Sequence, residues 1–398
     1  MPLSFYTICM KNFKNVTWGP NTKLNHPPSV ELSPGNEPLL NPIYHSSKFS
    51  LGKEAPYWDQ YVYSRISNPT VDQLQKTLAA AMNREECIVF GSGIAAITNT
   101  FLSLLKSGDH IIGFRESYRP TRVFIRDTLP RFGISSTILK LNDFSGLKKA
   151  IQPGITKIIH FESPTNPNLQ LADIEEIIKI AKDNNILVSM DGTFAGIHQH
   201  NNFDFDLTLH SLTKYANGHG DVIAGAVAGK KELMLEIKKI SHLLGAALDP
   251  QAANLVLRGL KTYHLRFSKQ CESAKVVADF LNQHPKVFKT YYPGLDSYHQ
   301  LSLAQQQMKD SGAIVSFELK PGNLKASDFC HQLKLISFAV SLGSTESIIC
   351  PTLKFFGEDL CVEDRSEMGI NDFSIRLSVG IEDVNDIIND LEQVLELI

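Results

Sequence analysis

Short apolar segments alternate with longer helix-forming segments through the middle of the chain, and this alternation limits the fold more than any other feature. Strands that alternate with helices build a mostly parallel sheet with helices on both faces. We therefore expect an α/β fold. The predicted strands are 87–90, 110–114, 155–161, 186–190 and 222–227, and the predicted helices are 70–83, 94–105, 120–132 and 173–184.

The two ends of the chain differ from this middle part. Residues 1–60 are rich in Pro, Asn and Ser and show little periodicity, which is typical of an extended arm. Asp249-Pro250 opens a long helical stretch that ends before Pro285. Because 398 residues exceed one ordinary core, we predict an arm, a large domain and a small α/β domain. Their ranges are 1–65, 66–284 and 285–398, and the small domain should hold strands near 312–319, 336–341 and 373–379 and a helix from Glu382.

The composition argues against several classes of function. With 39 basic and 42 acidic residues and a net charge of −3, nucleic acid and anionic membranes are not the expected partners. The six cysteines form no CxxC pair, which disfavours a metal site and favours free thiols in the cytoplasm. Lys11 and Lys14 follow the N-terminal apolar stretch, the reverse of a secretory signal, and no apolar run is long enough for a membrane span. We expect a soluble, cytoplasmic protein.

A glycine turn, Gly91-Ser92-Gly93, lies between a predicted strand and a predicted helix. Backbone N–H groups at a helix N-terminus can approach a phosphate, and the helix dipole favours negative charge there. The segment also matches the dinucleotide pattern G-x-G-x-x-A, with Glu116 in the place of the ribose-binding acid. A plain tight turn is the third interpretation, and the glycine turn alone does not decide among them.

Two further segments suggest chemistry. Ser211, Thr213 and Lys214 place two hydroxyls and an amine where they could meet one phosphorylated ligand. A lysine among apolar and small neighbours is desolvated, which lowers its pKa and makes it a nucleophile toward an aldehyde. Asp191 ends an apolar strand, at the sheet edge where α/β proteins bind ligands. It could cap the next segment or pair with a protonated ring nitrogen.

Together these segments closely resemble the cysteine/methionine-metabolism family of pyridoxal-phosphate (PLP) enzymes, which includes cystathionine γ-lyase, cystathionine β-lyase, cystathionine γ-synthase and methionine γ-lyase. The matching stretches run in family order: Tyr63–Thr70, Ser92–Ala96, Glu162–Pro167, Asp191–Phe194, His210–Tyr215, Arg258–Thr262, Tyr292–Leu295, Ser341–Gly343 and Arg376–Gly380. The resemblance implies the aspartate-aminotransferase-like fold (fold type I). It makes 66–284 the PLP-binding domain and 1–65 an arm that contacts a neighbouring subunit.

The resemblance also implies a role for each site residue. Lys214 would carry pyridoxal 5'-phosphate, Asp191 would pair with its ring nitrogen, and Tyr118 would stack on the ring and take part in proton transfer. Tyr63 and Arg65 would reach the phosphate of the neighbouring subunit, so a homo-oligomer such as a dimer of dimers is expected. The remaining cofactor-site residues are Ser92, Gly93, Ile94, Asn166, Thr193, Ser211 and Thr213, and the substrate-site residues are Ser341 and Arg376.

This chain departs from the family pattern at several positions. Gly192 replaces the usual Asn, and Ile197 replaces a Pro. After Pro351 the chain continues Thr352-Leu353-Lys354-Phe355-Phe356 in place of Met-Thr-His, which predicts a remodelled substrate entrance. The positions that carry acidic or other pocket residues in relatives specific for cystathionine are apolar here, namely Val62, Val123 and Val340.

The predicted activity is therefore cleavage of a carbon–sulfur bond in a sulfur amino acid, by β- or γ-elimination to a thiol, ammonia and a 2-oxo acid. An apolar wall cannot compensate the desolvation of the distal ammonium of cystathionine, so cystathionine should not be strongly preferred over methionine. Pro120 stands where methionine γ-lyases carry a cysteine, which favours a β-lyase instead. Three alternatives remain open: a γ-replacement enzyme of the cystathionine γ-synthase or O-acylhomoserine sulfhydrylase type, a nicotinamide-dependent oxidoreductase, and a non-catalytic binding protein.

Overall fold

The computed structural model describes residues 36, 38–53, 56, 59–322 and 324–397. The chain divides into two compact units, Met1–Pro42 and Ile43–Ile398, and the second contains both sheets and every helix described below. Most of the predicted arm, including Lys11 and Lys14, falls outside the described residues. The boundaries at 65 and 284 stay predictions.

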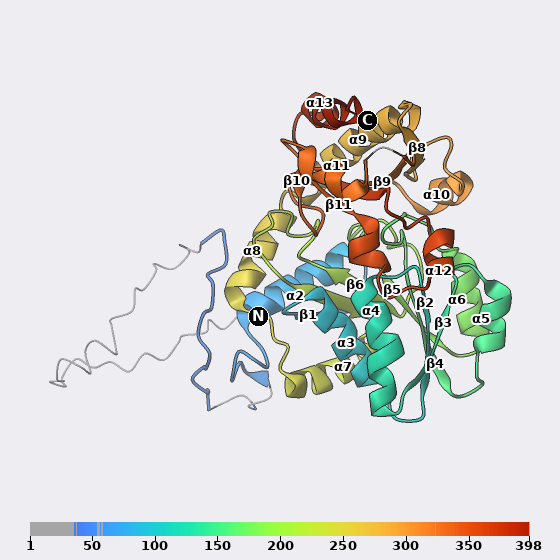
Figure 1. Ribbon diagram of the computed structural model, residues 1–398. Helices are drawn as coiled ribbons and strands as arrows, with labels where there is room; N and C mark the ends of the chain where they lie inside the picture. Colours follow the sequence, from blue (N-terminus) through green and yellow to red (C-terminus); the bar gives the residue numbers. More distant parts are fainter. Residues whose placement is uncertain (1–35, 37, 54–55, 57–58, 323, 398) are drawn as a thin grey trace. The chain divides into compact units, whose positions relative to one another are not determined.

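A seven-stranded sheet forms the centre of the first part of this unit (Figure 1). Its neighbouring strands run parallel except β7, which is antiparallel to both β1 and β6. The predicted mostly parallel α/β sheet is confirmed. Its strands, in spatial order, are β1 (Glu86–Phe90), β7 (Gly225–Gly229), β6 (Leu207–Ser211), β5 (Leu187–Asp191), β4 (Thr156–Glu162), β2 (His110–Phe114) and β3 (Ser135–Leu139).

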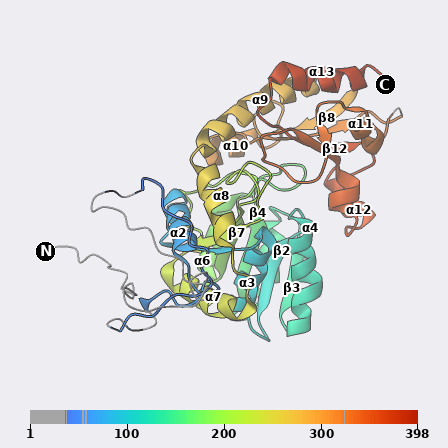
Figure 2. The ribbon, with the colours of Figure 1, turned by 90° about the vertical axis from the view of Figure 1, so that its left-hand side faces the viewer.

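Helices cover both faces of this sheet (Figure 2). Successive residues of β2 point to opposite faces, so Ile111 packs in the cluster that includes α3 while Ile112 packs in the one that includes α6. Polar caps start several helices; the Asn68 side chain, for example, accepts a hydrogen bond from the Thr70 N–H at 2.9 Å. The helices are α2 (Pro69–Ala81), α3 (Gly93–Leu104), α4 (Arg119–Val123), η2 (Phe124–Thr128), η3 (Leu129–Phe132), α5 (Phe144–Ala150), α6 (Ile174–Asp183), α7 (Lys231–Leu244) and α8 (Pro250–Leu260).

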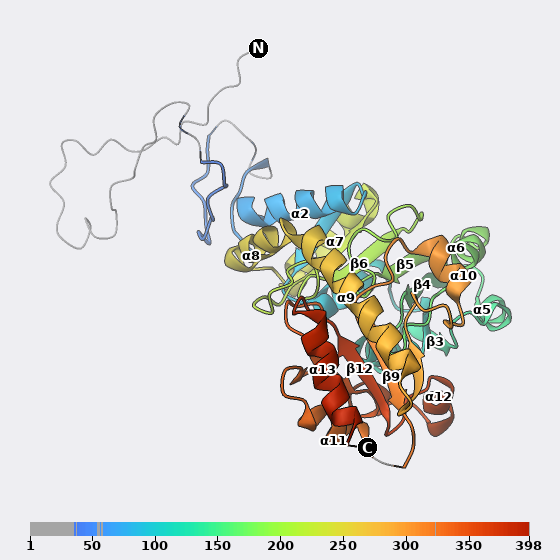
Figure 3. The ribbon, with the colours of Figure 1, turned by 90° about the horizontal axis from the view of Figure 1, so that it is seen from above.

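A second, five-stranded sheet with its own core follows along the chain (Figure 3). In spatial order its strands are β10 (Ser337–Phe338), β11 (Ile348–Pro351), β12 (Ser374–Ser378), β9 (Ile314–Leu319) and β8 (Val287–Tyr291). The helices of this part are α9 (Tyr263–Gln283), α10 (Leu301–Gln307), α11 (Ala326–Gln332), η4 (Leu353–Gly357), α12 (Val362–Glu367) and α13 (Val384–Leu395). No helix in the described residues has the length and apolar character that spanning a bilayer requires.

The structure corrects three element boundaries. The predicted long helix after Asp249 is two helices, α8 and α9. Helix α8 ends at Leu260, and the Gly259 carbonyl near its end accepts a hydrogen bond from the Arg266 side chain at 2.8 Å. The strand predicted at 222–227 is β7, which begins three residues later. Ala224 still belongs to the segment before the strand, because its N–H donates to the Thr213 hydroxyl. The strand predicted at 336–341 is shorter in the structure, where it comprises only the two residues of β10.

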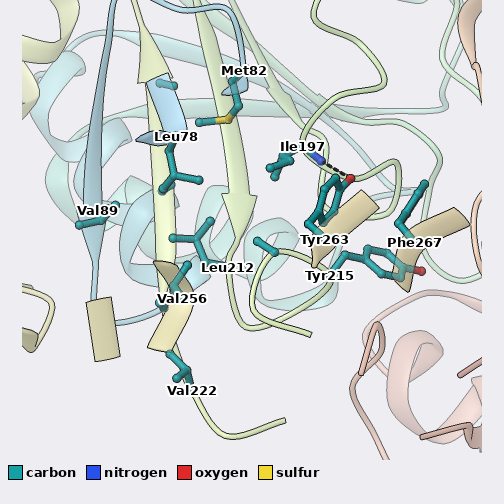
Figure 4. Close-up of a cluster of buried hydrophobic side chains, with 14 of the residues drawn as sticks. Leu78, Met82, Val89, Ile197, Leu212, Tyr215, Val222, Val256, Tyr263 and Phe267 are labelled. Carbon is teal, nitrogen blue, oxygen red and sulfur yellow. Dashed lines mark hydrogen bonds between the residues drawn. The ribbon is translucent and has the colours of Figure 1, made fainter. Parts of the chain in front are cut away.

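A buried cluster supports the segment around Lys214 (Figure 4). Leu212 and Tyr215, on either side of Thr213-Lys214, are 0% and 2% exposed and anchor this turn. Figure 4 also shows the backbone N–H of Ile197 bonded to the Tyr263 hydroxyl, at 3.1 Å. Proline has no N–H, so the Ile197 departure from the family pattern permits this contact.

Candidate active site

Two predicted cofactor residues, Asp191 and Ser211, lie where parallel strands end, together with Glu162, to which sequence reasoning gave no role. Glu162, Asp191 and Ser211 are the last residues of β4, β5 and β6, and Glu162 is the register partner of Asp191. The carboxyl ends of parallel strands are the edge at which α/β sheets bind ligands. The strand order therefore brings these three side chains to one place.

Asp191 is buried, and its two oxygens are used differently. Oδ1 accepts hydrogen bonds from the backbone N–H and the hydroxyl of Thr193, at 2.9 and 2.6 Å. The Thr193 hydroxyl in turn accepts from the Ser211 N–H at 2.9 Å. Oδ2 accepts no hydrogen bond from any described residue. Burial raises the pKa of Asp191 although the Thr193 hydrogen bonds oppose the rise. The free oxygen is available to a cationic partner such as a protonated ring nitrogen.

Lys214 follows β6 and donates to the Ser341 hydroxyl, with Nζ and Oγ 2.5 Å apart. Burial, reinforced by the nearby Arg376 charge, lowers the pKa of the Lys214 amine to about 8. An amine with this pKa is substantially neutral slightly above pH 8, as attack on an aldehyde requires. The sequence prediction of a desolvated lysine agrees with this geometry.

Arg376, on β12, reaches the same place from the second sheet. Its guanidinium donates to the Asn166 side-chain oxygen at 3.0 Å and to the Ser341 carbonyl at 2.7 Å. Ser341 thus contacts both Lys214 and Arg376, and its backbone has φ +121°, which a non-glycine residue rarely adopts. Strain of this kind is typical of functional sites.

The N-terminus of α3 lies against β6. A Cβ built on Gly93 would stand 2.8 Å from the Ser211 Cβ, so only glycine lets the helix start approach Ser211 this closely. Ser92 caps the helix by accepting from the Ala95 N–H at 3.1 Å. The N–H groups of Gly93 and Ile94 have no acceptor inside the helix, which leaves them for an anion.

Tyr118 stands at the start of α4 and is 41% exposed. Its backbone N–H donates to the Glu162 carboxylate at 2.8 Å. Partial burial and the carboxylates of Glu162 and Asp191 raise the pKa of the Tyr118 hydroxyl, while Arg376 opposes the shift. The hydroxyl is therefore protonated at neutral pH and can donate a proton.

Tyr63 and Arg65 lie apart from this group. Arg65 donates to the His242 carbonyl at 2.6 Å, and its guanidinium stands 5.6 Å from the centre of the Tyr63 ring. No hydrogen bond or ion pair among the described residues joins either side chain to Lys214 or Asp191. Their predicted role at the site of a neighbouring subunit stays a prediction.

Sequence reasoning did not assign two residues that the structure brings to the site. The Phe356 ring stacks on the Arg376 guanidinium, 4.4 Å from its carbon to the ring centre. Arg122 bonds the Phe356 carbonyl from the other side, at 3.0 Å. The signal for Arg122 is a stripe of arginines at helical spacing, Arg115, Arg119, Arg122 and Arg126. Glu116, the predicted ribose-binding acid, instead accepts from the Leu141 N–H at 2.8 Å.

These residues fit pyridoxal phosphate. The Gly93–Ser211 contact leaves a helix N-terminus and a hydroxyl together as an anion cradle, whereas the Thr213 hydroxyl is bonded to the carbonyl and N–H of Ala224. The free oxygen of Asp191 suits a pyridinium nitrogen, and the low pKa of Lys214 suits an aldehyde. The phosphate, ring and aldehyde ends of the cofactor therefore each have a matching group.

The comparisons with known proteins agree. The chain is 42% identical to an L-methionine gamma-lyase of Fusobacterium nucleatum subsp. nucleatum over 372 residues, 90% of this chain and 94% of that protein. It is 37% identical to the chloroplastic cystathionine gamma-synthase 1 of Nicotiana tabacum, covering 90% of this chain and 68% of that one. The crystal structure of cystathionine gamma-lyase from Lactobacillus plantarum complexed with L-serine superposes with a TM-score of 0.84 at 37% identity, over 90% of this chain and 93% of that chain. The family model described as Cys/Met metabolism PLP-dependent enzyme matches residues 29–396, and the chain belongs to this family.

Proposed function

We propose that this chain is a PLP-dependent carbon–sulfur lyase whose favoured substrates are uncharged thioether amino acids such as methionine. The observation that carries the proposal is the contact of Ser341 with both Lys214 and Arg376. This contact places the Lys214 amine and the Arg376 guanidinium on two sides of one residue. An α-amino acid needs such an arrangement, because the amine must reach its α-carbon while the guanidinium binds its carboxylate. The γ-lyase outcome yields methanethiol, ammonia and 2-oxobutanoate from methionine and water.

Each residue has a step that follows from its chemistry. Bound pyridoxal phosphate supplies an electron sink that stabilises negative charge at the α-carbon. Lys214 takes the α-proton, since its lowered pKa brings the neutral amine within reach close to physiological pH. Arg376 binds the substrate carboxylate through its planar pair of donors. Tyr118, protonated at neutral pH, gives a proton to the leaving thiolate.

The preference for an uncharged substrate rests on the apolar positions near the site. Val340 immediately precedes Ser341, and Val123 closes the short helix that Tyr118 begins. Valine offers no partner for a second ammonium group, whereas a methyl thioether needs none. Relatives named methionine gamma-lyase at 36–42% identity support this preference.

Steady-state kcat/KM for L-methionine and L-cystathionine, with identification of the 2-oxo acid, tests the proposal. We expect kcat/KM for methionine to equal or exceed that for cystathionine, with 2-oxobutanoate from both, whereas pyruvate from cystathionine would mark β-cleavage. A preference for cystathionine above about a hundredfold, roughly 2.7 kcal/mol in the transition state, would refute the apolar wall.

The alternative is a γ-replacement enzyme, which the 37% identity to a cystathionine gamma-synthase keeps in view. Such an enzyme joins a thiol to an activated homoserine and uses the same cofactor residues. Assays with an O-acylhomoserine, with and without cysteine, separate the two activities. A lyase releases a 2-oxo acid in both assays, whereas a replacement enzyme forms a thioether when the thiol is present.

We also propose that the active unit is a cytoplasmic homo-oligomer, a dimer or a dimer of dimers. Tyr63 is 44% exposed, and Arg65 lies beside it away from Lys214, so both are available to a second subunit. Mixing Arg65→Ala with Lys214→Ala protein should restore activity, because one site of each mixed pair keeps both groups. Absence of recovery despite proven subunit exchange would refute the shared site.

A further inference from the structure

Arg122 is the largest fully buried side chain of the described residues, at 1% exposure, and it uses all five of its N–H donors. Nε and Nη2 bind the Asp359 carboxylate at 3.0 and 2.6 Å. Nη1 donates to the carbonyls of Arg115 and Ser117, at 2.8 and 2.5 Å. Nη2 also donates to the Phe356 carbonyl at 3.0 Å. Because every N–H donor is used, the Arg122 guanidinium is held in one orientation.

The Arg122 guanidinium connects two segments of the chain that border the site. Arg115 and Ser117 belong to the turn that leads into Tyr118, at the start of α4. Phe356 lies in η4, and Asp359 follows two residues after the end of η4. Both are in the part of the chain that forms the second sheet (Figure 1). The Arg122 guanidinium is thus the bond between the segment that carries Tyr118 and the remodelled segment after Pro351.

Phe356 carries the connection on to Arg376. Its ring lies 4.4 Å from the Arg376 guanidinium carbon and is itself 7% exposed. Among the described residues Nε of Arg376 has no hydrogen-bond partner, so Asn166, Ser341, the Phe356 ring and the more distant Phe194 ring, 5.8 Å away, hold the guanidinium. Loss of the Phe356 ring would remove the nearer of the two rings and let the guanidinium shift.

Two other arginines of the stripe, Arg119 and Arg126, make more exposed contacts, and the largely buried Arg115 pairs with Glu116, Asp364 and Glu367 rather than with Asp359. Arg119 pairs with Glu358, and the two side chains are 35% and 55% exposed. Arg126 pairs with its neighbour Asp127 at 2.8 Å and makes longer contacts with the carbonyl and carboxylate of Asp359, at 3.3 and 3.4 Å. Exposed pairs contribute little, whereas the bidentate Arg122–Asp359 pair is buried on both sides. Arg122 is therefore the member of the stripe that fixes Phe356.

We propose that Arg122 is a positioning residue for the substrate carboxylate: with Asp359 it holds Phe356 on Arg376 and locks that contact to the turn before Tyr118. The proposal rests on the proposed function, because it needs Arg376 to bind the carboxylate. It gives the segment after Pro351 a defined task, although this segment departs from the family pattern.

The test measures ligand binding rather than turnover. L-Norleucine replaces the sulfur of methionine by a methylene and has no leaving group, and L-norleucinol also lacks the carboxylate. Their dissociation constants are measured by spectral titration of the holoenzyme, together with cofactor content and the thermal unfolding midpoint. Arg122→Lys and Phe356→Leu should each weaken norleucine about tenfold and norleucinol less than about twofold. Arg126→Gln, the matched control, should change both by less than about twofold.

A double-mutant cycle with Arg376→Lys identifies the route of the effect. If Arg122 and Phe356 act through Arg376, adding either change to Arg376→Lys should weaken norleucine little further. Full additivity, or equal weakening of norleucine and norleucinol, would overturn this proposal alone. If Arg376→Lys itself left norleucine binding unchanged, the carboxylate role in the proposed function would fall as well. Should Arg122→Lys not fold, Phe356→Leu carries the test, since it leaves the ion pair intact.

Discussion

The two halves of the site are assembled differently. The half proposed to bind the cofactor, the cofactor half (Asp191, Thr193, Ser211 and Lys214), comes from one stretch of chain that spans the ends of two neighbouring strands. The half proposed to bind the substrate, the substrate half (Ser341, Phe356 and Arg376, with Asn166, predicted as a cofactor-site residue but bonded to Arg376), joins residues up to 210 positions apart and draws on both sheets. A contiguous half keeps a recognisable motif, whereas a dispersed half depends on how the sheets meet.

The halves also differ in how firmly they are held. Backbone N–H groups fix Asp191 and Thr193, through bonds at 2.9 Å each. Arg376 relies on the Asn166 side-chain oxygen, the Ser341 carbonyl and the stacked Phe356 ring. Its buried Nε has no hydrogen-bond partner among the described residues. Changes in the cofactor half should therefore cost cofactor or folding, and changes in the substrate half should cost selectivity.

The largest effect is expected at Lys214. Lys214→Ala should abolish turnover, because the chain then lacks both the amine that holds the cofactor and the base that takes the α-proton. Borohydride reduction of the wild-type holoenzyme, followed by peptide mapping, should find the pyridoxyl group on Lys214. Its discovery on a different lysine would contradict the assignment of the cofactor half.

Acid should act through three buried histidines, two of which lie on strands β4 and β6 of the first sheet. Burial lowers the pKa of His160 and His210 to about 3 and that of His200 to about 4. The unfolded chain binds these protons below about pH 6.5 while the folded chain does not, so the free energy of unfolding falls with pH from there down to about 3–4. At two pH units below 6.5 the loss is about 2.7 kcal/mol per histidine.

Urea unfolding at pH 7 and near pH 4.5 measures this loss. His200 offers a clean variant, since neither ring nitrogen has a hydrogen-bond partner among the described residues. His200→Leu should reduce the pH dependence by about a third of the three-histidine total. An unchanged slope in His200→Leu would show that its ring is already charged in the folded protein.

Arg376→Lys probes the substrate half directly. Lysine keeps the charge but loses the bidentate geometry. We expect kcat/KM for methionine to fall by about a hundredfold, or roughly 2.7 kcal/mol, while cofactor content stays unchanged. Loss of the cofactor from this variant would show that the two halves are not separable.

The cofactor half could be predicted from sequence because its signals are local. Lys214 is flanked by apolar and hydroxyl residues, and Asp191 ends an apolar strand. The same holds for the parallel sheet, whose buried strands are short apolar runs. Phe356 and Arg122 could not be assigned in this way, since 234 positions separate them and neither lies in a motif. Strands β3 and β6 were not predicted either, because polar residues interrupt their apolar pattern, as Ser135, Ser136 and Thr137 do in β3.

The smallest effect concerns Gly192, where relatives usually carry Asn. A Cβ here would stand 2.8 Å from the His210 Cε1 and 3.2 Å from the Met190 Cε. The His210 ring is buried and cannot withdraw freely, although the end of Met190 can. Gly192→Ala should therefore lower the free energy of unfolding by about 1–2 kcal/mol, since overpacking outweighs the usual gain from removing a glycine. Gly52→Ala is the control, because its Cβ would meet only the Gln60 Oε1, at an ordinary 3.5 Å. Chemical denaturation of both variants decides the point. If Gly192→Ala is as stable as Gly52→Ala, then His210 moves easily, and the departure from Asn at this position is not explained by packing against His210.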